Sequence, residues 1–127
     1  MSDVFVTPPP TISTKSVLDF LYNHYGFSAS IEKLSSDRDL NFKVSSKEKT
    51  YVMKIANSSE DFKVLEMQNN ALRFIASQDE KIEVPLPIES NQKKDITIIE
   101  DPSGKYHARL LTYIEGDFLK DVEPDNQ

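Results

Sequence analysis

The chain has 127 residues and carries 15 Lys plus Arg against 21 Asp plus Glu, which gives a formal net charge of −6. Its length suits a single domain. The acidic balance argues against a nucleic-acid partner, because such surfaces need clustered positive charge. The chain has no cysteine, which excludes disulfide scaffolds, thiolate zinc sites and cysteine nucleophiles. Its two histidines, His24 and His107, lie far apart in the sequence, so we expect no metal site.

The hydrophobic pattern favours a cytoplasmic globular domain. Hydrophobic residues make up 38% of the chain, which includes 7 Phe and 5 Tyr, and this is enough for one core. No apolar run approaches the roughly 20 residues that cross a bilayer, so we expect no membrane partner. The first residues lack the basic start and the long apolar stretch of a signal peptide.

An amphipathic helix is predicted after a short N-terminal tail. The triplet Pro8-Pro9-Pro10 cannot join a helix or a sheet ladder, so residues 1–13 are assigned to the tail. Ser13 or Thr14 is a suitable N-cap, and Gly26 ends the helical pattern. Between them, four side chains recur at helical spacing, namely Val17, Leu18, Leu21 and Tyr25.

Three strands are predicted next, as an antiparallel meander. Residues 31–34 are a short apolar run, and apolar and polar residues alternate over 40–44 and over 51–55. The polar segment 45–49 between the last two has the length of a hairpin connection.

A second helix is predicted after residues 57–59, because Asn57, Ser58 or Ser59 can cap it and acidic residues follow. At about 100° per residue, its apolar side chains cover one broad arc. Gln68 falls near the centre of this arc and Glu66 almost opposite, so we expect Gln68 to face the sheet and Glu66 to face solvent. The arc contains Val64, Leu65, Met67, Ala71, Leu72, Phe74 and Ile75.

Two further strands complete the predicted fold. Residues 84–88 form an extended connector, since each proline there disfavours helix in the preceding residue. Strands are expected at 96–100 and 106–114, joined by the turn sequence Asp101-Pro102-Ser103-Gly104. The order of elements indicates an α+β fold with about five strands, mostly antiparallel, and a helix inserted after the third strand.

Lys54 has the clearest potential chemistry, because it lies on the third strand just before the inserted helix. In protein-kinase-like folds a lysine at this place holds the α- and β-phosphates of a nucleotide. The alternative is an edge-strand lysine that points into solvent. The glycine-free turn at 34–42 is either a phosphate loop, acting through serine hydroxyls and backbone N–H groups, or an ordinary solvated turn. Residues 109–116 are either a purine-binding hinge or a buried strand.

Together these motifs resemble the hydroxylysine kinase branch of the aminoglycoside phosphotransferase / choline kinase superfamily, over about residues 14–122. The same module occurs in bacteria fused to a class III aminotransferase. The similar segments are SSDRDLNFKV (35–44), YVMKIANS (51–58), LEMQNNALRFI (65–75), VP (84–85) and RLLTYIEG (109–116).

The resemblance implies a protein-kinase-like N-lobe at 14–116 with an N-terminal helix and a helix C, followed at 117–127 by the start of a linker to an absent C-lobe. The cofactor would be ATP or GTP with Mg²⁺, not required for folding, and the partners would be the nucleotide and the missing lobe. Lys54 would bind the α- and β-phosphates. Ser35, Ser36 and Asn41 would line the phosphate loop, Leu34 and Val52 would pack on the purine, and Thr112 and Ile114 would offer it backbone groups.

Two departures from the family pattern limit what the resemblance implies. Relatives of the aminoglycoside type have a Glu where this chain has Gln68, so Gln68 becomes the expected partner of Lys54 and supplies no charge neutralisation. The catalytic Asp, the Asn and the Mg²⁺-binding Asp of the second lobe have no counterpart in the sequence, and no catalytic residue is assigned.

The expected function is therefore the nucleotide-binding lobe of a kinase that phosphorylates a hydroxyl of an amino-alcohol or hydroxy-amino acid such as hydroxylysine, inactive alone. The alternative is a non-catalytic, degenerate interaction module. Self-association is also expected through an exposed apolar surface on the hinge side, formed by Leu111, Tyr113, Phe118 and Leu119.

Overall fold

The computed structural model describes residues 11–34, 39–47 and 49–114. These residues form two helices and one sheet of six strands, in the order β1-β2-β3-β6-β4, with β5 also paired to β6. Every pairing is antiparallel, which confirms the predicted α+β class. The elements are α1 (Thr14–Tyr25), β1 (Ser30–Leu34), β2 (Leu40–Ser46), β3 (Lys49–Ile55), α2 (Phe62–Gln78), β4 (Pro87–Ile88), β5 (Thr97–Asp101) and β6 (Gly104–Thr112).

The strands overlap the predicted ranges, with one addition, and β6 begins and ends two residues earlier than predicted. The predicted connector at 84–88 contributes the two-residue strand β4, which pairs with Leu110 and Leu111 of β6. A strand this short has no alternation to detect, so the sequence shows only its extended backbone.

Helix α1 begins and ends as predicted. The Ser13 hydroxyl accepts a hydrogen bond from the Ser16 N–H at 3.1 Å, which is the N-cap geometry. Gly26 ends the helix in the left-handed conformation with φ of 75°, which favours glycine. The side chains that α1 buries are Val17, Phe20 and Leu21.

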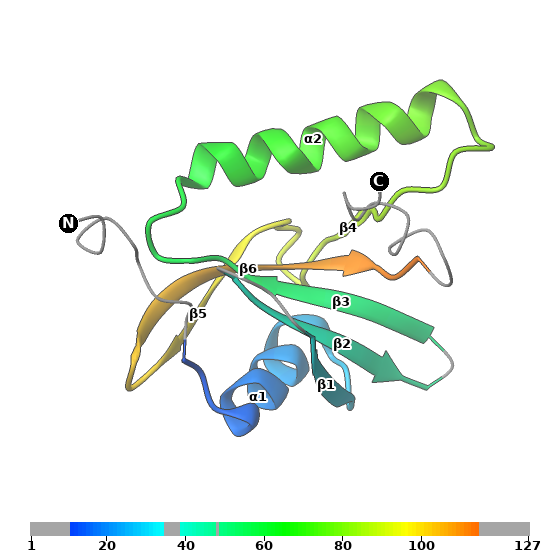
Figure 1. The fold of residues 1–127 in the computed structure, drawn as a ribbon. Helices are drawn as coiled ribbons and strands as arrows, with labels where there is room; N and C mark the ends of the chain where they lie inside the picture. Colours follow the sequence, from blue (N-terminus) through cyan, green and yellow to red (C-terminus); the bar gives the residue numbers. More distant parts are fainter. Residues whose placement is uncertain (1–10, 35–38, 48, 115–127) are drawn as a thin grey trace.

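The main core lies between α1 and one face of the sheet, whereas α2 crosses the opposite face (Figure 1). Alternate residues of the central strands point into this core, and all twelve residues of the cluster are apolar. They are Ile12, Val17, Phe20, Leu21, Leu40, Phe42, Val44, Met53, Ile55, Ile99, Ala108 and Leu110. The period-two pattern used to predict the strands therefore reflects a real difference between the two faces of the sheet.

Helix α2 begins later than expected. Its N-cap is Asp61, whose carboxylate accepts a hydrogen bond from the Lys63 N–H at 2.9 Å, so the prediction of a cap at 57–59 is wrong. Asn57 is 1% exposed, and its side-chain oxygen accepts hydrogen bonds from the N–H and the hydroxyl of Ser59. Asn57 thus shapes the loop before the helix instead of capping it.

The predicted face of α2 is only partly right, because the buried face is rotated from the predicted one by about one residue, or about 100°. Leu65 is buried as predicted, and the Gln68 side chain reaches Arg109 of the sheet. The buried positions are Leu65 and Asn69, whereas Gln68 is exposed. Met67 and Phe74, which the predicted arc places inside, are 63% and 64% exposed. Glu66 is exposed, as predicted.

Candidate functional site

A row of side chains crosses four strands on the α2 side of the sheet. Leu34 of β1 lies opposite Asn41 of β2, Asn41 opposite Lys54 of β3, and Lys54 opposite Arg109 of β6. Cross-strand partners share one face, and Met53 and Ile55, on either side of Lys54, point into the opposite, apolar core. The fold therefore brings Leu34, Asn41 and Lys54 together, as expected, and adds Arg109.

Lys54 is half-buried on a central strand, because β3 lies between β2 and β6. The alternative of an edge-strand lysine pointing into solvent is therefore wrong. Burial lowers the pKa of Lys54, the positive charge of Arg109 lowers it further, and the carboxylate of Asp39 raises it. The ammonium group thus lies in an environment that disfavours its own charge.

Arg109 connects the sheet to α2. Its side chain is buried, and its Nη1 and Nη2 atoms donate to Asn69 Oδ1 and Gln68 Oε1, both at 2.6 Å. Burial lowers the pKa of Arg109, while Asp39 and Glu60 raise it. The structure thus gives Gln68 a different partner from the one expected, because its amide oxygen binds Arg109.

Two buried polar atoms near this row have no hydrogen-bond partner within the described part of the chain. They are Oδ1 of Asn41, which neighbours Lys54, and Nδ2 of Asn69, whose oxygen binds Arg109. Buried polar side-chain atoms are normally satisfied in folded proteins. The row therefore contains protein hydrogen-bonding groups that a bound ligand could satisfy.

Val52 lies next to the row, two residues before Lys54 on the same face of β3. Its neighbours on that face are Lys43 of β2 and Leu111 of β6. Val52 is half-buried and so is Leu34, so each leaves apolar surface beside the cations. Ser35 and Ser36, the expected phosphate-loop residues, lie outside the described residues.

Of the expected hinge residues, Thr112 is the last residue of β6 and Ile114 lies two residues beyond it. The Thr112 N–H donates to the Leu86 carbonyl at 2.9 Å, and the Thr112 hydroxyl accepts from the Leu86 N–H at 2.9 Å. This N–H is therefore already used inside the fold. Ile114 is half-buried at the end of the described segment.

The apolar surface expected on the hinge side is not formed as predicted. Leu111 is 2% exposed, because it packs within the sheet between β3 and β4. Tyr113 is half-buried, and the Lys43 ammonium lies 5.0 Å from its ring centroid. The other expected members, Phe118 and Leu119, lie outside the described residues.

Sequence reasoning gave no role to Arg109 or Asn69, the two buried residues of this site. A signal for Arg109 was present: it is a charged residue inside the apolar run Ala108-Arg109-Leu110-Leu111. A cation inside an apolar segment of a central strand is expected to be buried with its neighbours, and a buried charge requires partners. Asn69 carried no comparable signal, because asparagine on a helix usually faces solvent.

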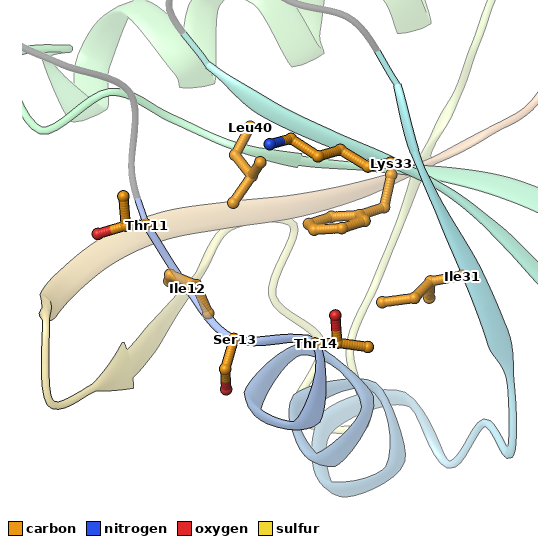
Figure 2. A pocket seen from close by; sticks show the side chains of 8 residues that line it. Thr11, Ile12, Ser13, Thr14, Ile31, Lys33 and Leu40 are labelled. Carbon is orange, nitrogen blue, oxygen red and sulfur yellow. The ribbon is translucent and has the colours of Figure 1, made fainter.

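A separate hollow of about 540 Å³ lies on the α1 side of the sheet (Figure 2). Its lining residues are Thr11, Ile12, Ser13, Thr14, Ile31, Lys33, Leu40 and Phe42. Leu40 and Phe42 belong to the apolar core, so this hollow lies across the sheet from Lys54.

Neither described helix is long and apolar enough to cross a membrane. Within the described residues, no group of three or more His, Cys, Asp and Glu side chains is placed to hold a metal ion.

No protein-family model matches the sequence, and no curated protein is significantly similar to it. Solved structures do match. A microcompartment-associated aminopropanol kinase is 16% identical with a TM-score of 0.69, over 91% of this chain and 34% of that one. An amicoumacin kinase in complex with AMP-PNP and Ca²⁺ is 18% identical with a TM-score of 0.70, over 83% and 32% of the two chains.

A spectinomycin phosphotransferase in complex with ADP and spectinomycin is 15% identical, with a TM-score of 0.60, over 84% of this chain and 31% of that one. The chain therefore spans about a third of the length of each of these proteins. At these identities the likeness shows the fold. The described residues have the α+β fold of a kinase-like N-lobe.

Proposed function

We propose that the chain is the nucleotide-binding lobe of a small-molecule kinase, in which the whole protein transfers the γ-phosphate of ATP or GTP to a hydroxyl group. The observation that carries the proposal is the position of Lys54. It is a half-buried cation on β3, opposite Arg109, on the sheet face that α2 crosses and that carries unsatisfied polar atoms. In kinases a lysine on this strand pairs with the α- and β-phosphates.

The residues of the row suit a nucleotide. Lys54 would bind the phosphates, and Asn41 would lie beside them on the neighbouring strand. Leu34 and Val52 offer apolar surface for a purine on the same face, which supports their expected role. Mg²⁺ binds proteins mainly through one or two carboxylates plus the substrate's phosphates, so it would be held at this site largely by the nucleotide.

Similar solved structures support the class of acceptor. They are an aminopropanol kinase, an amicoumacin kinase and a phosphotransferase with bound spectinomycin. We propose an amino-alcohol or a hydroxy-amino acid of hydroxylysine type for the whole protein, in line with the resemblance of the sequence. Gln68 remains a proposed member of the nucleotide site, acting through Arg109.

The test is to titrate the purified chain with ATP and with GTP and to measure the binding affinity by calorimetry. Lys54→Ala should weaken binding by about tenfold or more, because a charge-assisted contact with phosphate is lost. Lys49→Ala is the matched control, since Lys49 lies on the same strand but is exposed. Equal affinities for the wild type and both variants would refute the proposed role of Lys54.

The chain alone should show no phosphotransferase turnover with hydroxylysine or choline as acceptor. Positioning and charge neutralisation supply most of the catalysis in phosphoryl transfer, and the sequence offers no counterpart of the catalytic Asp and Asn. Release of ADP or GDP that depends on such an acceptor would contradict this expectation.

A second candidate, a non-catalytic interaction module, is favoured by one observation. The outer surface of α2 exposes Met67 and Phe74, large apolar side chains that the fold does not cover. Exposed apolar patches of this kind mark interaction sites. Nucleotide binding that depends on Lys54 separates the two candidates.

A further inference from the structure

Arg109 carries a charge that the described fold does not neutralise by direct pairing. At 8% exposure, it is the one charged side chain among the buried residues of the described segments. Both of its hydrogen bonds go to neutral amide oxygens. Within the described residues, neither Arg109 nor Lys54 forms an ion pair with a carboxylate. The carboxylates of Asp39 and Glu60 favour the charge of Arg109 from a distance, but neither forms an ion pair with it in the described residues. A buried cation is costly unless it is paired, so the positive charge at this site is only partly compensated.

Lys54 adds a second positive charge, because it lies directly opposite Arg109 on the neighbouring strand. Residues in such a pair have Cβ atoms about 5 Å apart, and like charges placed there destabilise the sheet. Arg109 is also one of the causes that lower the pKa of Lys54. An anion bound beside these residues would neutralise both cations at once.

Asn69 gives an independent indication of a missing acceptor. Its side chain is 1% exposed, its oxygen accepts from Arg109, and its Nδ2 donor has no partner within the described residues. The same amide therefore fixes the guanidinium and leaves a buried N–H donor unused. Phosphate oxygens are strong acceptors for amide, guanidinium and ammonium donors.

We propose that Arg109 is a second cation of the phosphate site, the inner partner of Lys54, and that Asn69 and Gln68 hold it in place. This inference rests on the proposed function, since it assigns a further binding residue to the same nucleotide. The ligand class is a polyphosphate, because two cations match a chain of phosphates better than a single charge.

The experiment titrates the purified chain with ATP, AMP and adenosine. Arg109→Met should weaken ATP binding by about tenfold or more, weaken AMP binding less and leave adenosine binding unchanged. Lys105→Met is the matched control, because Lys105 is an exposed cation on the same strand. A residue with only a structural role would lower stability without changing the ratio of ATP to AMP affinity.

An unchanged ratio of ATP to AMP affinity in Arg109→Met would overturn this inference and leave the proposed function intact. Failure of the wild-type chain to bind any nucleotide would overturn both. If Arg109→Met does not fold, the side-chain Nε–H signal of Arg109 in the wild type decides, measured by NMR during addition of inorganic tripolyphosphate. If the Arg109 signal shifts and saturates at the same tripolyphosphate concentration as the Lys54 signals, the inference is supported. If the Lys54 signals shift and the Arg109 signal does not, the inference is refuted.

Discussion

The two faces of the sheet are built in different ways. The α1 face buries a cluster of twelve residues that are all apolar. The α2 face has an apolar cluster of only three, Ala56, Leu65 and Ile96, and beside it the buried polar pair Asn69 and Arg109. Hydrophobic burial scales with apolar area, so most of the stability should come from the α1 face.

Buried polar atoms without a partner in the described chain occur on both faces, with Tyr25 and Thr97 on the α1 side, but the α2 face also opposes two like charges. Lys54 and Arg109 are like charges on opposing positions, and Asn41 and Asn69 each leave a buried polar atom without a partner in the described chain. Unfavourable arrangements of this kind gather at functional sites, where a ligand relieves them. The comparison therefore places most of the apolar core on one face and the proposed binding site on the other.

The largest expected effect is a loss of stability on the α1 face. Leu110→Ala should lower the free energy of unfolding by about 2–5 kcal/mol, because Leu110 is 0% exposed and its removal leaves a cavity in the core. Urea denaturation measures this loss. Lys105→Ala, at an exposed position of the same strand, should change it by less than about 0.5 kcal/mol. A comparably small loss for Leu110→Ala would mean that the α1 face does not dominate stability.

The same difference explains what the sequence predicted well. On the α1 face only apolar burial decides the structure, so alternation in β2 and β3 and the spacing in α1 were sufficient. Ser13 and Gly26 then mark the ends of α1 by local chemistry that the sequence states directly.

On the α2 face the sequence was a poorer guide, for physical reasons. The rotation of α2 is set partly by the hydrogen bonds of Arg109 to Asn69 and Gln68, which a count of apolar side chains ignores. Propensity also favoured a cap at Asn57, Ser58 or Ser59, but Asn57 accepts hydrogen bonds from Ser59 in the preceding loop and the helix is capped by Asp61. Lys54 could be singled out from the sequence because its position on a strand before a helix depends neither on the rotation of α2 nor on the N-cap of α2.

The next effect is a loss of stability at alkaline pH from Tyr25, which packs against the α1 core. Burial raises the pKa of Tyr25 to about 12 from its usual value of 10.0. Between these values the unfolded chain releases the phenolic proton and the folded chain retains it, so stability falls as the pH rises. Tyr25→Phe should remove roughly 2 kcal/mol of this fall by pH 12. Parallel unfolding curves for both proteins from pH 9 to 12 would contradict the assignment.

Lys54 should change the pH dependence of stability in the opposite direction to Tyr25. Repulsion between Lys54 and Arg109, which are opposed like charges, should change the free energy of unfolding by up to about 1 kcal/mol. The pKa of Lys54 in the folded chain is lowered below 10.5, mainly by burial and then by Arg109. The folded chain therefore loses the Lys54 proton before the unfolded chain does, and this contribution to stability rises with pH up to about 10.5. Lys54→Met should be at least as stable as the wild type at pH 7, and the gap should close toward pH 10.5. A variant that is clearly less stable at pH 7 would show that the ammonium stabilises the fold.

The smallest expected change in stability concerns the outer surface of α2, where Met67 and Phe74 are exposed. Met67→Glu combined with Phe74→Glu should alter the free energy of unfolding by less than about 0.5 kcal/mol, because neither side chain is packed in the fold. The same double variant should reduce self-association at high concentration, since it removes an exposed apolar patch and adds charge. Sedimentation velocity on both proteins measures the association. The control is Asn70→Glu combined with Ser77→Glu, which adds the same two negative charges at exposed, polar positions of the same helix with the same spacing. A loss of several kcal/mol in the Met67 and Phe74 variant would show that α2 uses these side chains for folding, and the division between a folding face and a binding face would then fail.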